Sequence, residues 1–89
     1  MISRKIRIIN KLGLHARAAA KLVACTSQFQ SSIEIERRGR KVNGKSIMGV
    51  MMLAAANGSE IDIHLDGPDE QQALEAVESL INARFDEQE

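Results

Sequence analysis

The chain has 89 residues, twelve of them basic and twelve acidic, so it has the size of one small domain and a formal net charge of zero. It contains no tryptophan or tyrosine, and this composition argues against both a basic nucleic-acid surface and an aromatic stacking platform. The single cysteine, Cys25, excludes an internal disulfide and is expected to be a small apolar packing residue. We expect one domain over residues 1–89, without a signal peptide, in the cytoplasm, and binding neither nucleic acid nor membrane.

Four segments in which apolar and polar residues alternate predict four β-strands. The first covers residues 6–9 and the second residues 32–36. The third is short, follows a basic turn at residues 37–41 and ends near Val42, and the fourth covers residues 61–66. Because every strand alternates, the predicted sheet has one packed face and one face in water.

Three other segments have helical patterns. The first runs from about Ala16 to about Ser27 and is rich in strong helix formers. The second is an apolar run at residues 47–56, which begins after Ser46 and ends at Asn57-Gly58. The third follows Asp69, in a segment that resembles a capping box, and has an apolar stripe of Ala73, Val77, Leu80 and Ile81.

The resulting order is strand, helix, strand, strand, helix, strand, helix. It predicts an α+β fold, a two-layer open-faced β-sandwich in which three helices cover the packed face of the sheet. The acidic end of the chain, residues 86–89, is expected to fray.

His15 stands where the first strand gives way to the first helix, in the segment Gly13-Leu14-His15-Ala16-Arg17. The free N–H groups of the first helical turn, which include the backbone of Ala16 and Ala18, and the charge of Arg17 create a positive field there. We expect this field to keep the imidazole neutral and nucleophilic and to favour a phosphate attached to it. The alternative is that His15 is a helix cap or a solvated side chain, as most histidines at a helix start are.

The apolar run after Ser46 contains more apolar side chains than one small sheet can cover. We expect some of the long ones to stay in water as a partner-binding patch, the candidates being Ile47, Met48, Met51 and Met52. The alternative is that they belong to the core of a helix with different boundaries. Ser46 itself would cap this helix.

Two polar features have ordinary structural explanations. The basic turn at residues 37–41 is expected to be a solvated hairpin tip facing Glu34 and Glu36, because no aromatic residue is interleaved with it. His64 is expected to be exposed on the polar face of the fourth strand, since no other ligand has a spacing that suits a metal.

Two segments together resemble the HPr family, the histidine phosphocarriers of the phosphoenolpyruvate-dependent phosphotransferase system. The first is Gly13-Leu14-His15-Ala16-Arg17 followed by Ala19-Ala20, and the second is Lys45-Ser46-Ile47-Met48-Gly49-Val50-Met51 further along. The likeness covers essentially the whole chain. It implies an antiparallel sheet in strand order 1-4-2-3 and a monomeric phosphoryl carrier, not an enzyme, that needs no metal or cofactor.

The resemblance also implies roles for particular residues. His15 would accept a phosphoryl group from enzyme I and pass it to EIIA-type acceptors, while Arg17 neutralises its charge. Ser46 would be phosphorylated by an HPr kinase/phosphorylase, and the patch that docks partners would include Ile47, Met48 and Met51.

One residue departs from the family pattern, because Ala18 stands where the family normally has proline. The change restores a backbone donor and some freedom in the first helical turn, which puts the rate of transfer in doubt. Two alternative functions remain: a nitrogen-related phosphocarrier paralogue, and an interaction module that binds a transcription regulator under the control of Ser46 phosphorylation. A third alternative is a small regulatory domain that binds a ligand.

Overall fold

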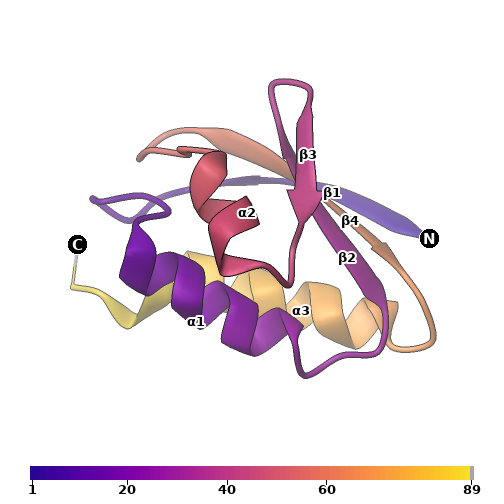
Figure 1. The fold of residues 1–89 in the computed structure, drawn as a ribbon. Coiled ribbons are helices and arrows are strands. Elements are labelled where there is room, and N and C mark those ends of the chain that lie inside the picture. The colour runs from indigo at the N-terminus through magenta and orange to yellow at the C-terminus, as the bar shows by residue number, and fades with distance from the viewer. Residues whose placement is uncertain (89) are drawn as a thin grey trace.

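The computed structural model describes residues 1–88 and contains one sheet, three α-helices and a short 3-10 turn (Figure 1). The sheet is antiparallel with the strand order β1-β4-β2-β3, which confirms the predicted open-faced α+β sandwich. The strands are β1 (Ile2–Arg7), β2 (Ser32–Arg37), β3 (Arg40–Asn43) and β4 (Glu60–Asp66). The helical elements are α1 (Ala16–Thr26), α2 (Ile47–Met52), α3 (Glu70–Asn82) and η1 (Arg84–Asp86).

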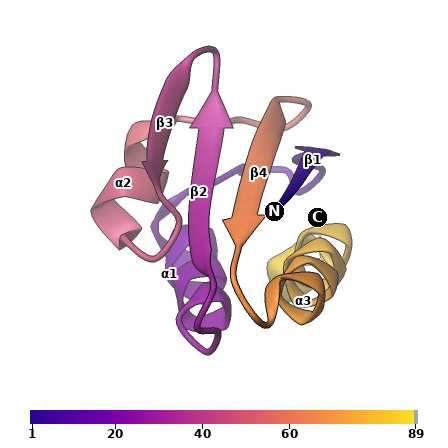
Figure 2. The same ribbon diagram turned by 90° about the vertical axis from the view of Figure 1, so that its right-hand side faces the viewer.

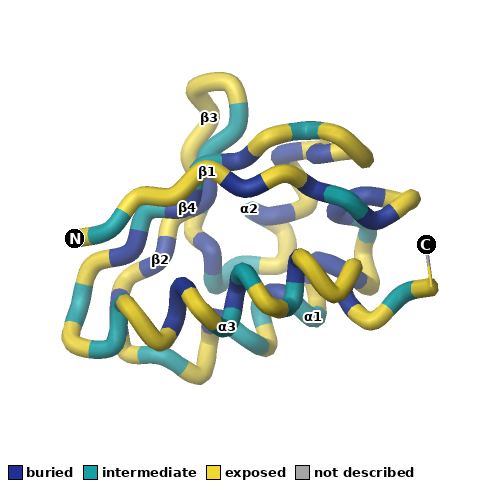
Figure 3. The backbone as a smooth tube through the Cα atoms, turned by 180° about the vertical axis from the view of Figure 1, so that it is seen from behind, coloured by how far each residue is buried: buried dark blue, intermediate teal, exposed yellow. Residues whose placement is uncertain are grey.

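The register of the strands places the predicted apolar residues on one face. Ile6 pairs with Ile61, and Ile35 pairs with Ile63, so each strand adds its buried side chains to the same layer. The helices lie on this side, with α1 and α3 next to each other and α2 beside β3 (Figure 2). Buried segments therefore face the space between the sheet and the helices, whereas the other face of the sheet stays open to solvent (Figure 3).

The first strand begins and ends earlier than the sequence predicts. It covers Ile2–Arg7, although Ile8 is still fully buried and continues the pairing through bonds with the backbone of Ser59 and Gly58. Helix α1 matches the prediction closely and buries Ala19, Leu22 and Thr26.

Helix α2 is shorter than predicted, because it ends at Met52 instead of Ala56. The backbone of Ala54 is left-handed, with φ of 51°, and the chain turns so that Leu53 and Ala55 enter the core. The Arg37 guanidinium donates to the carbonyl of Leu53 at 3.1 Å, and Arg40 donates to that of Met52 at 3.4 Å. These arginines satisfy carbonyls that a helix end leaves free, so the basic turn is not simply a solvated tip as predicted.

The predicted capping box at the start of α3 is absent. The Asp69 carboxylate instead accepts hydrogen bonds from the backbone N–H groups of Gln30 and Ser31, both at 2.9 Å, and from the Ser31 hydroxyl. The Ser31 hydroxyl and the Gln30 amide hold the pKa of Asp69 below its ordinary value. Asp69 thus fastens the loop before β2 to the start of α3, and the buried stripe of α3 includes Leu74, while Leu80 is only half-buried.

Residues 86 and 87 belong to the segment that is predicted to fray, but they are held in place, Asp86 by a bond to the Ala83 carbonyl and Glu87 by bonds to Asn10 and His15. Glu89 lies outside the described residues. Arg84, Phe85 and Asp86 all have left-handed backbones, with φ of 56°, 54° and 63°. Such a turn is strained for residues other than glycine, and it is held here by the fully buried Phe85 ring and by the Lys21 ammonium, which donates to the Phe85 carbonyl at 2.7 Å. The turn directs Glu87 back towards the start of α1.

Gly13 is the glycine on which the loop before α1 depends most. Its φ is +67°, and a Cβ at this position would lie 2.4 Å from the Ala55 carbonyl oxygen. We predict that Gly13→Ala lowers the free energy of unfolding by about 3 kcal/mol, because a left-handed backbone and an overpacked contact each cost about 1–2 kcal/mol.

Gly39 is the matched control, since its φ is +82° but nothing lies within 4 Å of an added Cβ. Gly39→Ala is expected to cost about 1 kcal/mol, the backbone part alone. Urea unfolding of the two variants measures the difference, and equal losses would contradict the close contact at Gly13.

Candidate functional site

His15 is the N-cap residue of α1, with an extended backbone (φ −74°, ψ 178°). Its carbonyl accepts the first helical hydrogen bond, from Ala19 N at 2.8 Å, and its ring Nδ1 accepts from Arg17 N at 3.3 Å. The side chain is 28% exposed, so the ring lies at the surface and is not enclosed. The predicted position of His15 is therefore confirmed, and the residue does cap the helix.

The loop that leads to His15 is fixed from inside the protein. The side chain of Asn10 is fully buried, and its Nδ2 donates to the Gly13 carbonyl at 2.9 Å. Leu14 is buried and donates its N–H to the Ala55 carbonyl at 2.8 Å. These bonds hold the backbone on the amino-terminal side of His15, while α1 holds it on the other side.

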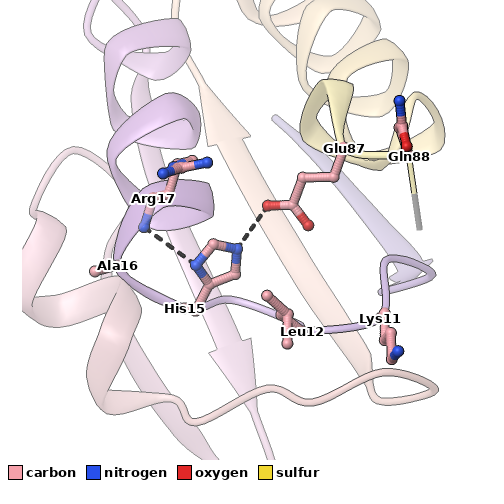
Figure 4. A pocket seen from close by; sticks show the side chains of 7 residues that line it. All are labelled: Lys11, Leu12, His15, Ala16, Arg17, Glu87 and Gln88. Carbon is pink, nitrogen blue, oxygen red and sulfur yellow. Dashed lines mark hydrogen bonds and ion pairs between the residues drawn. The ribbon is translucent and has the colours of Figure 1, made fainter.

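Glu87 completes the surroundings of the ring, and the sequence analysis missed it. Its Oε2 lies 2.6 Å from His15 Nε2, and its Oε1 accepts from Asn10 Nδ2 at 3.0 Å (Figure 4). The Asn10 amide, followed by the His15 ring, holds the pKa of Glu87 below its ordinary value. The helix end and Arg17 lie beside the ring as expected, but a carboxylate that the sequence does not predict lies against Nε2.

The two hydrogen bonds of the ring assign its tautomer. A carboxylate only accepts hydrogen bonds, so Nε2 carries a proton and its N–H donates a hydrogen bond to Glu87. Nδ1 accepts from Arg17 N and therefore holds a lone pair. This lone pair is directed to the amino end of α1, where backbone N–H groups lack helical partners.

The residues next to His15 differ in exposure. Ala16 and Arg17 are exposed, and among residues 1–88 nothing engages the Arg17 guanidinium. Ala18 is fully buried, so its side chain belongs to the core and only its backbone belongs to the helix end. An open pocket of about 910 Å³ lies here, lined by Lys11, Leu12, His15, Ala16, Arg17, Glu87 and Gln88 (Figure 4).

Ser46 and the apolar side chains of α2 are placed as predicted. The Ser46 hydroxyl accepts from Gly49 N at 3.1 Å and caps the helix, whose inward residue is Val50. The large side chains on its outer side are exposed, Met48 by 74%; the group consists of Ile47, Met48, Met51 and Met52. Because α2 packs against α1, this exposed patch lies on the helical side of the molecule, as His15 does.

His64 and Cys25, which the sequence also suggests as candidates for chemistry, lie away from His15. His64 is half-buried on the open face of the sheet, where its ring bonds to Ser3 Oγ at 2.8 Å and to Glu36 Oε1 at 2.9 Å. Cys25 is half-buried, and burial raises the pKa of its thiol.

Over residues 1–88 there is no group of three or more His, Cys, Asp or Glu side chains arranged to hold a metal ion. No helix in that range is long and apolar enough to cross a membrane.

The candidate site therefore lies at the surface and not in an enclosed cavity, with one histidine at a helix amino end whose Nε2 is bonded to Glu87 and whose Nδ1 is held only at 3.3 Å by Arg17 N. Residues 2–83 match the family model of the HPr component of the phosphotransferase system, described as a phosphorylation site. The phosphocarrier protein HPr of Cupriavidus necator is 55% identical over 89 residues, with all of both chains covered. The chain belongs to the HPr family of phosphocarriers.

Solved structures agree with this assignment. The crystal structure of HPr-C-His from Thermoanaerobacter tengcongensis has a TM-score of 0.96 and 43% identity, and all of both chains are covered. A second structure from that organism, described as an HPr dimer, has a TM-score of 0.79 and 44% identity, with 98% of this chain and all of that chain covered. Since that relative is a dimer, the expected monomeric state remains a prediction for this chain.

The lowered pKa of Glu87 leads to a prediction about acid stability. Because the pKa in the folded state lies below the unfolded value of about 4.3, the contribution of Glu87 is complete above that value and is lost as pH falls through the folded one. Between about pH 6 and about pH 3 the wild-type chain should therefore lose more stability than Glu87→Gln. Urea unfolding at the two pH values tests this, and a stability difference that stays constant would contradict it.

Proposed function

We propose that the chain carries a phosphoryl group on Nδ1 of His15, accepting it from enzyme I and donating it to EIIA-type acceptors. The protein acts as a stoichiometric carrier and requires no metal or cofactor. The observation that supports this most is the pair of hydrogen bonds on the ring, since Glu87 occupies Nε2 and leaves the Nδ1 lone pair at the open end of α1.

Transfer is an in-line displacement at phosphorus. The Nδ1 lone pair forms the new N–P bond, while the bond from phosphorus to the donor breaks and its electron pair leaves with the donor. The N–H of Arg17 is only weakly held by Nδ1, at 3.3 Å, so it is free to turn to a phosphoryl oxygen. The Arg17 guanidinium, which has no partner among the described residues, offers a planar pair of donors to the same group.

This arrangement suits a carrier better than a catalyst. A phosphoryl group has a charge of about −1.5 to −2 at neutral pH, and the end of α1 and Arg17 face that charge both in the bound state and during transfer. Interactions of similar strength in both states help the group to enter without raising the barrier to its departure. The partners therefore supply the enclosure and most of the catalysis.

Ala18 is expected to influence the rate of transfer and leave its chemistry unchanged. It is the third residue of α1, where the backbone N–H has no helical partner, so proline would cost no hydrogen bond and would stiffen the turn. Alanine leaves the turn more flexible. His15 and Arg17 remain in place.

We further propose that Ser46 is phosphorylated by an HPr kinase/phosphorylase and that Ile47, Met48 and Met51 form the patch on which partners dock. The Ser46 hydroxyl is at the amino end of α2, and the patch begins at the next residue. A phosphate there would place negative charge beside the apolar side chains and repel acidic partner surfaces. We also infer a single cytoplasmic domain that works as a monomer.

The central prediction concerns the two histidines. His15→Ala should accept no radiolabel from phosphoenolpyruvate and enzyme I, whereas His64→Ala should be labelled like the wild type because His64 lies on the open face of the sheet. Arg17→Ala should slow labelling about tenfold or more, since a charge-assisted pair of hydrogen bonds is lost. Label that persists in His15→Ala would contradict the assignment.

A second prediction concerns Ser46. Intact-mass measurement with an HPr kinase and ATP should show one added phosphate on the wild type and none on Ser46→Ala, and that variant should lose about 1 kcal/mol of stability with the helix cap. Ser79→Ala, an exposed change in α3, is the control and should still be phosphorylated. If the wild type gains no phosphate, Ser46 is only a cap. If only Ser46 and never His15 accepts phosphate, the protein is a regulatory interaction module.

A further inference from the structure

We propose that Glu87 is a positioning residue for phosphoryl transfer, which fixes the Nε2–H tautomer of His15 before transfer and balances the charge of the ring once Nδ1 is phosphorylated. This inference rests on the proposed function, because it assigns Glu87 a part in that reaction. The evidence for it is the geometry of the contact between Glu87 and His15 and the fold of the chain that brings the two residues together.

Both oxygens of the Glu87 carboxylate are engaged. Oε2 lies 2.6 Å from His15 Nε2, and Oε1 accepts from Asn10 Nδ2 at 3.0 Å. The Asn10 amide is fully buried and also donates to the Gly13 carbonyl, so it has a fixed position. The carboxylate therefore cannot rotate away from the ring without losing a second hydrogen bond, and its own side chain is only 16% exposed.

The backbone that presents Glu87 is also fixed. The buried ring of Phe85 and the Lys21 ammonium on its carbonyl hold the left-handed turn after α3. A residue 72 positions away in sequence is in this way brought to a set distance from His15. Histidines that must present one ring nitrogen commonly have the other nitrogen held by a carboxylate, because the two nitrogens compete for one proton.

The proton balance of the reaction explains what this contact does. When Nδ1 bonds to phosphorus, the Nε2 proton stays on the ring, and the ring gains positive charge as its lone pair is used. The Glu87 carboxylate balances that charge without taking the proton. Among residues 1–88, Glu87 is the one acidic side chain that lines the pocket with the ring, and Arg17 beside it is positive. Glu87 is therefore the group placed to balance the positive charge of the phosphorylated ring.

The test compares Glu87→Gln with Asp86→Asn. Glutamine keeps the size of the side chain, but it has no charge and both donates and accepts, so it no longer dictates which ring nitrogen is protonated. Asp86→Asn removes the same charge one residue away, at an exposed position whose left-handed backbone asparagine tolerates. Urea unfolding first establishes that both variants fold.

Two measurements follow on the full-length chain. Long-range ¹⁵N–¹H spectra of the ring should show the Nε2–H tautomer in the wild type and in Asp86→Asn, and a mixture of tautomers in Glu87→Gln. Single-turnover transfer from phosphorylated enzyme I should be about fivefold slower in Glu87→Gln than in either of the others, because a charge-assisted hydrogen bond is roughly twice as strong as a neutral one.

The outcomes separate this inference from the proposed function. If Glu87→Gln keeps both the tautomer and the rate of the wild type, Glu87 only fastens the turn after α3 and the inference is overturned. If the wild type accepts no phosphoryl group, the proposed function fails. The tautomer measurement needs no phosphoryl donor, so it would still decide whether Glu87 sets the ring.

Discussion

The candidate site depends on the hydrogen bonds of the buried side-chain amide of Asn10. Its Nδ2 joins the Gly13 carbonyl to the Glu87 carboxylate, and its backbone carbonyl accepts from Asn57 Nδ2 at 3.1 Å. One residue thus ties together the loop before α1, the loop before β4 and the turn after α3. Its own Oδ1 has no partner among the described residues, and a buried polar atom left in this way costs about 1–3 kcal/mol. The protein tolerates that cost at a place where three segments meet beside the His15 ring.

The sequence predicts most of the fold because its signals are local. Alternation over a few residues fixes which side chains of β2 and β4 face the core, and the helix formers after His15 place the start of α1. The end of α2 has no such signal, since Ala54 to Ala56 are good helix formers. The helix ends there because Leu53 is buried and because its carbonyl accepts from Arg37, a residue of β2.

The candidate site also contains both residues that a local motif predicts and a residue that it does not predict. His15 and Arg17 belong to one short motif, whereas Glu87 reaches the ring from 72 residues away and no periodicity marks it. The one available hint was Phe85, an aromatic residue in a polar segment, which suggests that the chain returns to the core there. Asp69 failed as a predicted cap for a similar reason, because the loop at Ser31 competes for its carboxylate more effectively than its own helix does.

The open face of the sheet shapes how the molecule meets other proteins. Its side chains are paired across strands, Lys5 with Asp62 and Arg7 with Glu60, and it offers no group of large exposed apolar side chains within residues 1–88. His15 and the exposed residues of α2 are both on the helical side. In the function proposed above, the donor and the acceptor would both bind on this side, so they would bind one after the other. A carrier of this kind works faster when each complex dissociates quickly, which favours short-lived complexes over tight ones.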